Sequence, residues 1–201
     1  MKLYYSPGAC SLASHIALLE AGLPFEAVRV GRDKKTADGN DFNVINPKGY
    51  VPALALDDGQ LLTEGTAVLQ YIADRNPASG LAPPAGDLQR YRLLEWLGYI
   101  NSEIHKNFSP FFNPAATAQM KDMAKANLQR RLAYAEQALG DKPFLLGERF
   151  TVADAYLFTI LGWGPAAGVD IGQWPGLKAL HARVGARPKV QAAMKAEGLA
   201  K

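Results

Sequence analysis

The chain of 201 residues is 48% hydrophobic and 20% charged, the composition of a globular protein with enough apolar side chains for a core. Its formal net charge of +3 is spread along the sequence, with no block of lysine or arginine longer than a pair, which argues against a nucleic-acid-binding protein. A single cysteine excludes an internal disulfide framework, and the 3 histidines are too scattered to predict a metal site.

The apolar segments of the sequence are short. No run approaches the roughly 20 apolar residues of a transmembrane helix, and the first residues, MKLYYSPGAC, lack the apolar stretch of a signal peptide. We therefore expect a reduced, cytoplasmic protein with no membrane or nucleic-acid partner.

The first part of the chain predicts short strands that alternate with helices. We expect strands at residues 2–5, 25–30, 50–56 and 60–62, and helices over residues 11–21 and from residue 63 onward. Apolar Leu12, Ile16 and Leu19 recur at helical spacing, and the Asp-Gly dipeptide between the last two strands is typical of a hairpin turn. This order predicts one layer of sheet covered by helices, with Thr63 as the N-cap of the last one.

A segment rich in proline, glycine and alanine separates this region from the rest of the chain. We assign residues 1–78 to an α/β domain, residues 79–86 to a linker and residues 87–201 to an all-helical domain. Helical patterns cover residues 87–107, 118–139, 152–163 and 175–197, with a break inside the last one at RPKV. Thr151 and Asp154 have the spacing of a capping box, which predicts a structural role for this pair.

Cys10 follows a Pro-Gly turn and precedes the first predicted helix. Unpaired N–H groups and the helix dipole stabilise a thiolate at such a position, which lowers the pKa of a cysteine and makes it reactive. The alternative is a small, inert core residue. Position 13 is alanine rather than a second cysteine, so redox chemistry at Cys10 would be monothiol, with the other sulfur supplied by another molecule.

Two further motifs suggest a site for a small peptide. If the bond between Val51 and Pro52 is cis, the Val51 backbone faces outward and can pair with an extended peptide; the alternative is an ordinary trans proline at a strand edge. The sequence TEGT at 63–66 opens a helix whose N–H groups would bind a carboxylate, while Glu64 could take an ammonium. Together with Cys10, these motifs describe a receptacle for a thiol peptide.

At this point the sequence resembles the glutathione S-transferases, specifically the bacterial beta class. The resemblance is carried, in order along nearly the whole chain, by MKLYYSPGACSLASHIAL, NPKGYVPAL, LTEGTAVLQYIAD, SEIHKNFSPFF and FTVADAYLF. It implies a thioredoxin-like N-terminal domain with a cis proline at Pro52, an all-α C-terminal domain, and a homodimer that uses glutathione as co-substrate and no metal.

The resemblance also implies a set of glutathione-binding residues. These are Cys10, Lys35, Val51, Pro52, Glu64, Gly65, Ser102, Glu103, His105 and Lys106. Cys10 and His105 would be catalytic, both close to the glutathione sulfur. Val51 would pair with the peptide backbone, Glu64 and Gly65 would hold the γ-glutamyl end, and Lys35 would hold the glycyl carboxylate. Ser102 would share a helix face with His105 or Lys106 at α-helical spacing.

The electrophilic acceptor is expected in an apolar, aromatic pocket. Its candidate lining residues are Tyr5, Phe108, Phe112 and Trp163, although aromatic residues at helical spacing also build cores. Related chains tend to carry Asn where this one has Gly98, so a ligand contact is either missing or supplied by Asn101. His15 and His181 receive no role from the resemblance and are interpreted as structural.

Three functions follow as hypotheses. The first is a glutathione transferase that adds the glutathione thiolate to electrophilic aromatic or halogenated compounds. The second is a glutathione-dependent monothiol oxidoreductase or reductive dehalogenase that acts through a mixed disulfide at Cys10. The third is a non-enzymatic interaction protein that reuses the fold.

Overall fold

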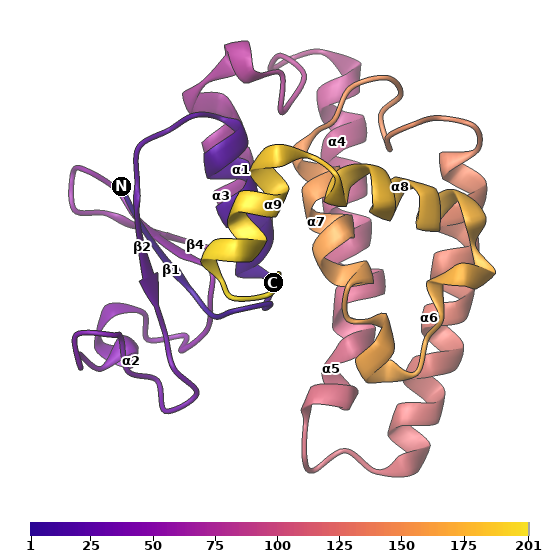
Figure 1. The fold of residues 1–201 in the computed structure, drawn as a ribbon, viewed down its shortest axis with the longest axis horizontal. Coiled ribbons are helices and arrows are strands. Elements are labelled where there is room, and N and C mark those ends of the chain that lie inside the picture. Colours follow the sequence, from indigo (N-terminus) through magenta and orange to yellow (C-terminus); the bar gives the residue numbers. More distant parts are fainter. Residues whose placement is uncertain (201) are drawn as a thin grey trace. The chain divides into compact units, whose positions relative to one another are not determined.

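The computed structural model describes residues 1–200, which fold into two compact units. The N-terminal unit combines Met1–Ala82 with the residues from Ala186 onward, and the helical unit spans Pro83–Gly185. This division differs from the domains expected from the sequence, which place residues 87–201 together. The reason is that the last helix, α9 (Pro188–Ala196), packs against α1 (Ser11–Glu20), as Figure 1 shows.

The N-terminal unit contains a 4-stranded sheet in the order β2-β1-β3-β4. The strands are β1 (Lys2–Tyr5), β2 (Glu26–Arg29), β3 (Ala53–Ala55) and β4 (Leu61–Thr63). β1 pairs with β2 in parallel and with β3 antiparallel, so Leu3 lies opposite both Ala27 and Leu54. The predicted hairpin is present between β3 and β4, where Gly59 has a φ of +84°.

Helices α1, α3 (Gly65–Arg75) and α9 are the longest helices of this unit. α1 contacts β1, α3 and α9, and each of its residues from Ser11 to Leu18 is buried. A helix enclosed in this way needs little polar surface, which explains the run of apolar and small side chains that follows Cys10.

A short helix, α2 (Phe42–Ile45), lies in a stretch for which the sequence predicts no helix. The Asp41 side chain caps it by accepting a hydrogen bond from the Asn43 N–H at 2.8 Å. Phe42 is fully buried, with its ring centroid 5.6 Å from that of Tyr4. Four residues are too few to show a helical periodicity, so only the cap and the anchoring aromatic residue signal this helix.

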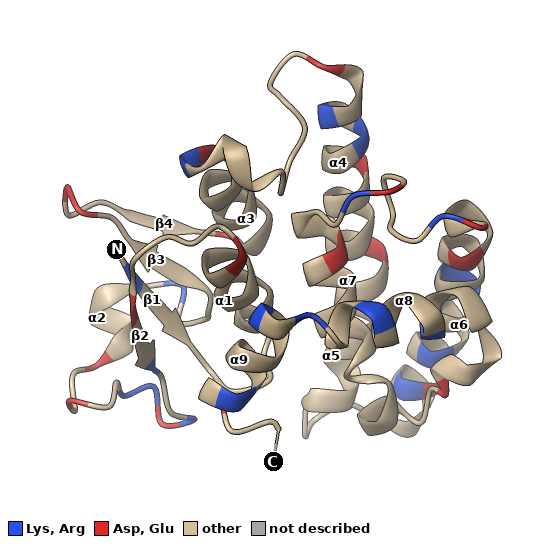
Figure 2. Ribbon diagram, turned by 45° about the horizontal axis from the view of Figure 1, so that its top comes forward, with Lys and Arg blue, Asp and Glu red and all other residues tan. Residues whose placement is uncertain are grey.

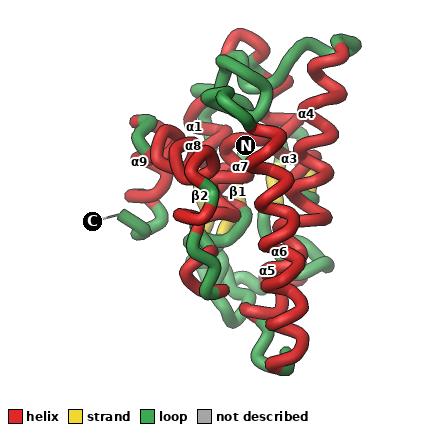
Figure 3. Tube along the Cα trace, turned by 90° about the vertical axis from the view of Figure 1, so that its right-hand side faces the viewer, coloured by secondary structure: helices red, strands yellow, loops and turns green. Residues whose placement is uncertain are grey.

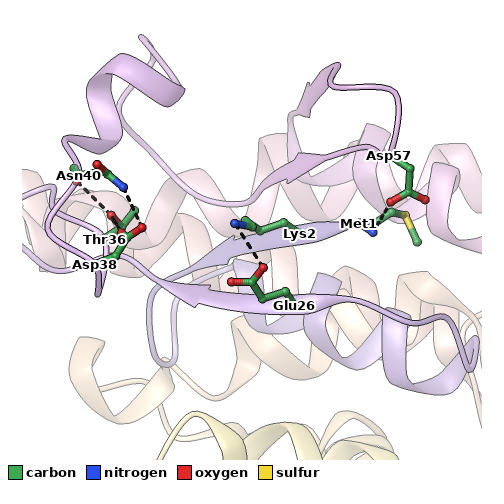
Figure 4. Close-up of polar contacts among 7 residues, drawn as sticks. All are labelled: Met1, Lys2, Glu26, Thr36, Asp38, Asn40 and Asp57. Atoms are coloured by element: carbon green, nitrogen blue, oxygen red, sulfur yellow. Dashed lines mark hydrogen bonds and ion pairs between the residues drawn. The ribbon is translucent and has the colours of Figure 1, made fainter.

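Polar side chains form contacts on the sheet of the N-terminal unit and in a loop beside it (Figure 4). Lys2 and Glu26, which are partners in the β1–β2 register, form an ion pair at 3.2 Å. In the loop after β2, Asp38 accepts hydrogen bonds from the side chains of Thr36 and Asn40. Glu26, Asp38 and Asn40 are exposed whereas Thr36 is buried, so solvent screens the charged groups and these contacts add little to stability. The Lys2–Glu26 pair joins two strands in register, and the Asp38 contacts order the loop after β2.

The helical unit contains helices joined by turns and loops, as the tube in Figure 3 shows. Its elements are α4 (Leu88–Tyr99), a π-helical turn (Ile100–His105), α5 (Lys106–Phe112), α6 (Ala118–Leu139), α7 (Val152–Leu161), the 3₁₀ turns Gly164–Ala167 and Ile171–Gln173, and α8 (Pro175–Gly185). Every residue of α7 is buried, which makes it the central helix of this unit. The break predicted at RPKV is present between α8 and α9.

The predicted capping box at the start of α7 is confirmed. The Asp154 carboxylate accepts hydrogen bonds from the Thr151 N–H at 2.8 Å and from the Thr151 hydroxyl at 3.0 Å. Its other oxygen accepts the Leu145 N–H at 2.8 Å, which ties the preceding loop to the helix. Burial raises the pKa of Asp154 to about 6, against the effect of these hydrogen bonds.

Charged residues of both signs are distributed over both units, as Figure 2 shows. No helix in the described part of the chain has the length and apolarity needed to cross a bilayer.

Candidate functional site

Cys10 lies at the start of α1, at its N-cap position, and its side chain is half-buried. The thiol donates a hydrogen bond to the Val51 carbonyl oxygen, with a sulfur–oxygen distance of 3.3 Å. The turn before it is closed by the Ala9 N–H, which donates to the Ser6 carbonyl at 3.0 Å. The structure therefore brings two of the expected glutathione-binding residues, Cys10 and Val51, into contact.

The turn that carries Cys10 is anchored by the end of the chain. The buried carboxylate of Glu197 accepts the Gly8 N–H at 2.9 Å, and its other oxygen lies 2.9 Å from Nδ1 of His15. Gly8 has a φ of +69°, and a Cβ there would stand 3.3 Å from the Leu199 side chain. The buried Glu197 carboxylate thus holds this turn from outside α1, and the space beside Gly8 leaves little room for a side chain.

The peptide bond between Val51 and Pro52 is cis, as the resemblance implies. The Val51 N–H has no hydrogen-bond partner among the described residues. Gly65 lies nearby, since a Cβ at this position would be 3.9 Å from the Pro52 ring. The Val51 N–H is therefore available to pair with an added extended chain, and the start of α3 lies beside it.

Glu64, rather than Thr63, is the N-cap residue of α3, so the expected Thr63 cap is wrong. Glu64 has an unusual φ of +69° for a residue other than glycine. The Lys48 ammonium lies 2.7 Å from its carboxylate and 3.0 Å from the Thr63 hydroxyl. The hydrogen bond that Lys48 donates to the Glu64 carboxylate raises the pKa of Lys48.

Lys48 is a residue that the sequence analysis missed. It lies in the motif NPKGYVPAL, but no regular spacing connects it with Glu64. Lys35, the predicted partner of the glycyl carboxylate, is exposed, and its backbone N–H donates to Asp33 at 3.2 Å. No side-chain contact joins Lys35 to Cys10, Val51 or Glu64 in the described part of the chain.

In the helical unit, His105 closes the π-helical turn after α4. Its Nδ1 lies 2.7 Å from the Tyr156 hydroxyl, and that hydroxyl donates to Oδ1 of Asn101 at 3.0 Å. Because the single hydroxyl proton is given to Asn101, Tyr156 accepts from Nδ1–H, which leaves Nε2 of His105 without a proton. Burial, together with the neighbouring Lys106 charge, lowers the pKa of His105 to about 4, so the ring is neutral at pH 7.

Aromatic rings surround Trp163 in the same unit. Ring centroids of His105, Phe112 and Phe108 lie 4.9, 5.3 and 5.7 Å from that of Trp163. Phe108 is 1% exposed and belongs to the core, whereas Phe112 is 54% exposed and can meet a ligand. We call His105, Phe108, Phe112 and Trp163 the aromatic cluster.

Tyr5, the remaining candidate for the acceptor pocket, belongs to the N-terminal unit. Its side chain is 8% exposed, and its ring centroid lies 5.6 Å from that of His15. This packing is typical of a core residue.

Comparison with known proteins identifies the family. The N-terminal domain model of the glutathione S-transferases matches residues 8–75, and the C-terminal domain model matches residues 99–188. The chain is 48% identical over 200 residues to glutathione S-transferase GstA of Escherichia coli O157:H7, covering 99% of this chain and 100% of that protein. The chain belongs to the glutathione S-transferase family.

Solved structures agree with this assignment. A ternary complex of BphK, a bacterial glutathione S-transferase, is 53% identical, with a TM-score of 0.97 over 99% of this chain and 100% of that one. A sphingomonad glutathione S-transferase complexed with glutathione is 51% identical, with a TM-score of 0.96 over 100% of both chains. The beta-class enzyme of Sphingomonas chungbukensis is 48% identical, with a TM-score of 0.95 over 99% of this chain and 100% of that one.

The resemblance to beta-class enzymes is therefore confirmed, and so is the fold, a thioredoxin-like domain followed by a helical domain. The protein is a glutathione transferase by its relatives.

The π-helical turn changes which of the candidate glutathione-binding residues in the helical unit of this transferase share a helix face. Ser102, Glu103, His105 and Lys106 lie in or directly after the turn, where α-helical spacing no longer says which residues share a face. Glu103 forms an ion pair with Arg131 at 2.7 Å, while Ser102 and Lys106 are exposed. No contact joins Ser102 to His105 in the described part of the chain.

The structure of this transferase also shows what surrounds Asn101 and Gly98. Asn101, considered as a replacement for the contact missing at Gly98, accepts the Tyr156 hydroxyl and thereby sets the proton position on His105. A Cβ at Gly98 would meet nothing within 4 Å, so this position is open. Among the described residues, no cluster of three or more His, Cys, Asp or Glu side chains could hold a metal ion.

Proposed function

We propose that this glutathione transferase binds glutathione along Val51, with the glutathione sulfur beside Cys10. The observation that carries the proposal is the contact of 3.3 Å between the Cys10 sulfur and the Val51 carbonyl oxygen. An extended peptide that pairs with Val51 can donate a hydrogen bond from its own backbone N–H to the same carbonyl oxygen. Its middle residue then lies next to the start of α1, where the positive end of the helix dipole favours a thiolate.

The two ends of glutathione carry charges that the N-terminal unit can match. We assign the γ-glutamyl end to Glu64 and Gly65, because Glu64 attracts the ammonium and the start of α3 offers backbone N–H groups to the carboxylate. Lys48 holds the Glu64 carboxylate in place at 2.7 Å. Lys35, whose side chain is exposed, remains our assignment for the glycyl carboxylate.

We assign the acceptor to the aromatic cluster. Phe112 and Trp163 offer ring surfaces to a flat electrophile, and Nε2 of His105 offers a hydrogen-bond acceptor. Ser102, Glu103 and Lys106 remain candidates for polar contacts to glutathione, with Glu103 already paired to Arg131.

The leading reaction is conjugation. The glutathione thiolate attacks an electrophilic carbon of an aromatic or halogenated compound, a carbon–sulfur bond forms, and a leaving group such as halide departs with the electron pair. Stabilisation of the thiolate lowers the pKa of the glutathione thiol and raises the fraction of reactive sulfur. Each pKa unit corresponds to about 1.4 kcal/mol of thiolate stabilisation.

A second reaction is favoured by the residue at position 10. A Cys10 thiolate at a helix start can attack the disulfide of oxidised glutathione, forming a mixed disulfide at Cys10 and releasing one reduced glutathione. The same intermediate would serve a monothiol oxidoreductase or a reductive dehalogenase, with glutathione as the reductant.

Replacing Cys10 separates the two reactions. For Cys10→Ala we expect loss of at least 90% of the reduction rate of a glutathione mixed disulfide and a smaller loss in conjugation of 1-chloro-2,4-dinitrobenzene. Mass spectrometry of the wild type after exposure to oxidised glutathione should show one added glutathione. Absence of that adduct would remove the redox reaction, and failure to bind immobilised glutathione would support the non-enzymatic alternative.

We also propose that the enzyme is a homodimer, which is the usual assembly implied by the resemblance. Light scattering during gel filtration should give about twice the 21.7 kDa of the chain. A mass that stays at one chain over a range of concentrations would contradict this assembly.

A further inference from the structure

The helical unit has a cavity that shares no residue with the aromatic cluster. Its volume is about 510 Å³, within the range of small-molecule sites. The lining includes Leu161, Gly162, Pro165, Val169, Ile171 and His181. It is therefore formed by the end of α7, the 3₁₀ turns that follow it, and α8.

One imidazole supplies polar atoms to this largely apolar cavity. The ring of His181 stacks on Phe158, with centroids 4.6 Å apart and an interplanar angle of 25°. Neither ring nitrogen has a hydrogen-bond partner among the described residues. Burial lowers the pKa of His181, which keeps the ring neutral at pH 7 with one N–H donor and one nitrogen acceptor. Both ring nitrogens of this half-buried imidazole therefore lack a hydrogen-bond partner within residues 1–200, and a ligand can supply one.

The charges at the rim favour a neutral ligand. Asp170 lines the cavity, and one of its carboxylate oxygens accepts the Gly172 N–H at 2.8 Å. The Lys125 ammonium is near the same rim, since a Cβ at Gly168 would be 3.6 Å from it. A negative and a positive group at one rim leave no net charge to attract an ion.

We propose that this cavity is a second binding site, for a small neutral aromatic alcohol of phenol size whose hydroxyl donates a hydrogen bond to the His181 ring. Leu161, Val169 and Ile171 contact the aromatic ring, and the imidazole fixes its orientation. The site is independent of glutathione and of the acceptor, because none of its lining residues belongs to the proposed substrate sites.

The wild-type enzyme provides a direct test. The chain has 3 histidines, so the ring Cε1–H signals can be resolved by NMR and that of His181 identified through His181→Phe. We expect phenol to shift the His181 signal in a saturable manner, with at least fivefold higher affinity than anisole, which has a similar size but no O–H donor. An unmoved His181 signal, or equal affinities for phenol and anisole, would overturn the proposal.

The variant and a crystal provide the matched comparison. His181→Phe preserves a ring that can stack on Phe158 but removes both nitrogens, so phenol should bind to it no more tightly than anisole. Phe112→Ala, which alters the aromatic cluster, should leave the phenol affinity measured at His181 unchanged. In crystals of the wild type soaked with 4-bromophenol, the anomalous bromine signal should lie in this cavity; bromine found only at the aromatic cluster would contradict the proposed site.

Discussion

At the scale of single residues, the neighbours of His105 determine which of its ring nitrogens carries the proton. Tyr156 gives its hydroxyl proton to Asn101 and must therefore receive one from Nδ1 of His105. Trp163 and the surrounding helices then exclude water from the ring, and the pKa falls to about 4. The residue that the resemblance singles out is thus a neutral hydrogen-bonding group with its lone pair at Nε2 rather than a cation.

This protonation state predicts how stability depends on pH. The pKa of His105 is about 4 in the folded protein and 6.5 in the unfolded chain, so its contribution is complete above pH 6.5 and is lost as pH falls toward 4. Relative to His105→Gln, the wild type should lose at most about 3 kcal/mol of unfolding free energy over that interval. Urea unfolding of both proteins at pH 7.5 and 4.5 measures this change, and an equal free-energy difference at the two pH values would contradict it.

At the scale of elements, α9 is fastened to α1 at both ends. Near its start, the Arg187 guanidinium binds the Glu20 carboxylate with contacts of 2.7 and 2.8 Å. Beyond its end, Glu197 holds His15 and the Gly8 N–H. Both attachments stabilise the packing of α9, but only Glu197 contacts the turn that carries Cys10.

This asymmetry predicts different effects of two similar substitutions. Glu197→Ala removes the acceptor of the Gly8 N–H, so we expect the KM for glutathione to rise about five- to tenfold, equivalent to about 1–1.4 kcal/mol. Arg187→Ala should destabilise the same helix packing and leave that KM within twofold of the wild type. Steady-state kinetics together with urea unfolding distinguish the cases; equal KM changes in the two variants would show that Glu197 acts only through stability.

At the scale of the whole molecule, the sequence predicted each strand of the described sheet and the capping box of α7. It missed α2, whose four residues are too short for a periodicity, and the π-helical turn, which shifts the spacing by one residue without any change in composition. Lys48 could not be found because its ion pair with Glu64 joins loops that are distant in the chain. The sequence also placed α9 in the helical domain, because helical periodicity does not identify the element against which a helix packs.

The division into units predicts a pattern of hydrogen exchange. Because α9 packs with α1, backbone amides of both helices should exchange through one shared opening as urea is raised in the native range. Amides of α7, in the centre of the helical unit, should follow a different opening free energy. Arg187→Ala should lower protection in α1 and α9 together. If α9 instead shares the opening of α7 and α8, the division is wrong.

The contact between the two ends of the chain also has a consequence during synthesis on the ribosome. The first strands and α1 are translated early, but the helix that covers α1 begins only at Pro188. About 105 residues separate Ala82 from Pro188, and at about 5–20 residues per second the ribosome needs roughly 5–20 seconds to translate them. Throughout that interval the face of α1 that α9 later covers stays exposed to solvent in the nascent thioredoxin-like unit.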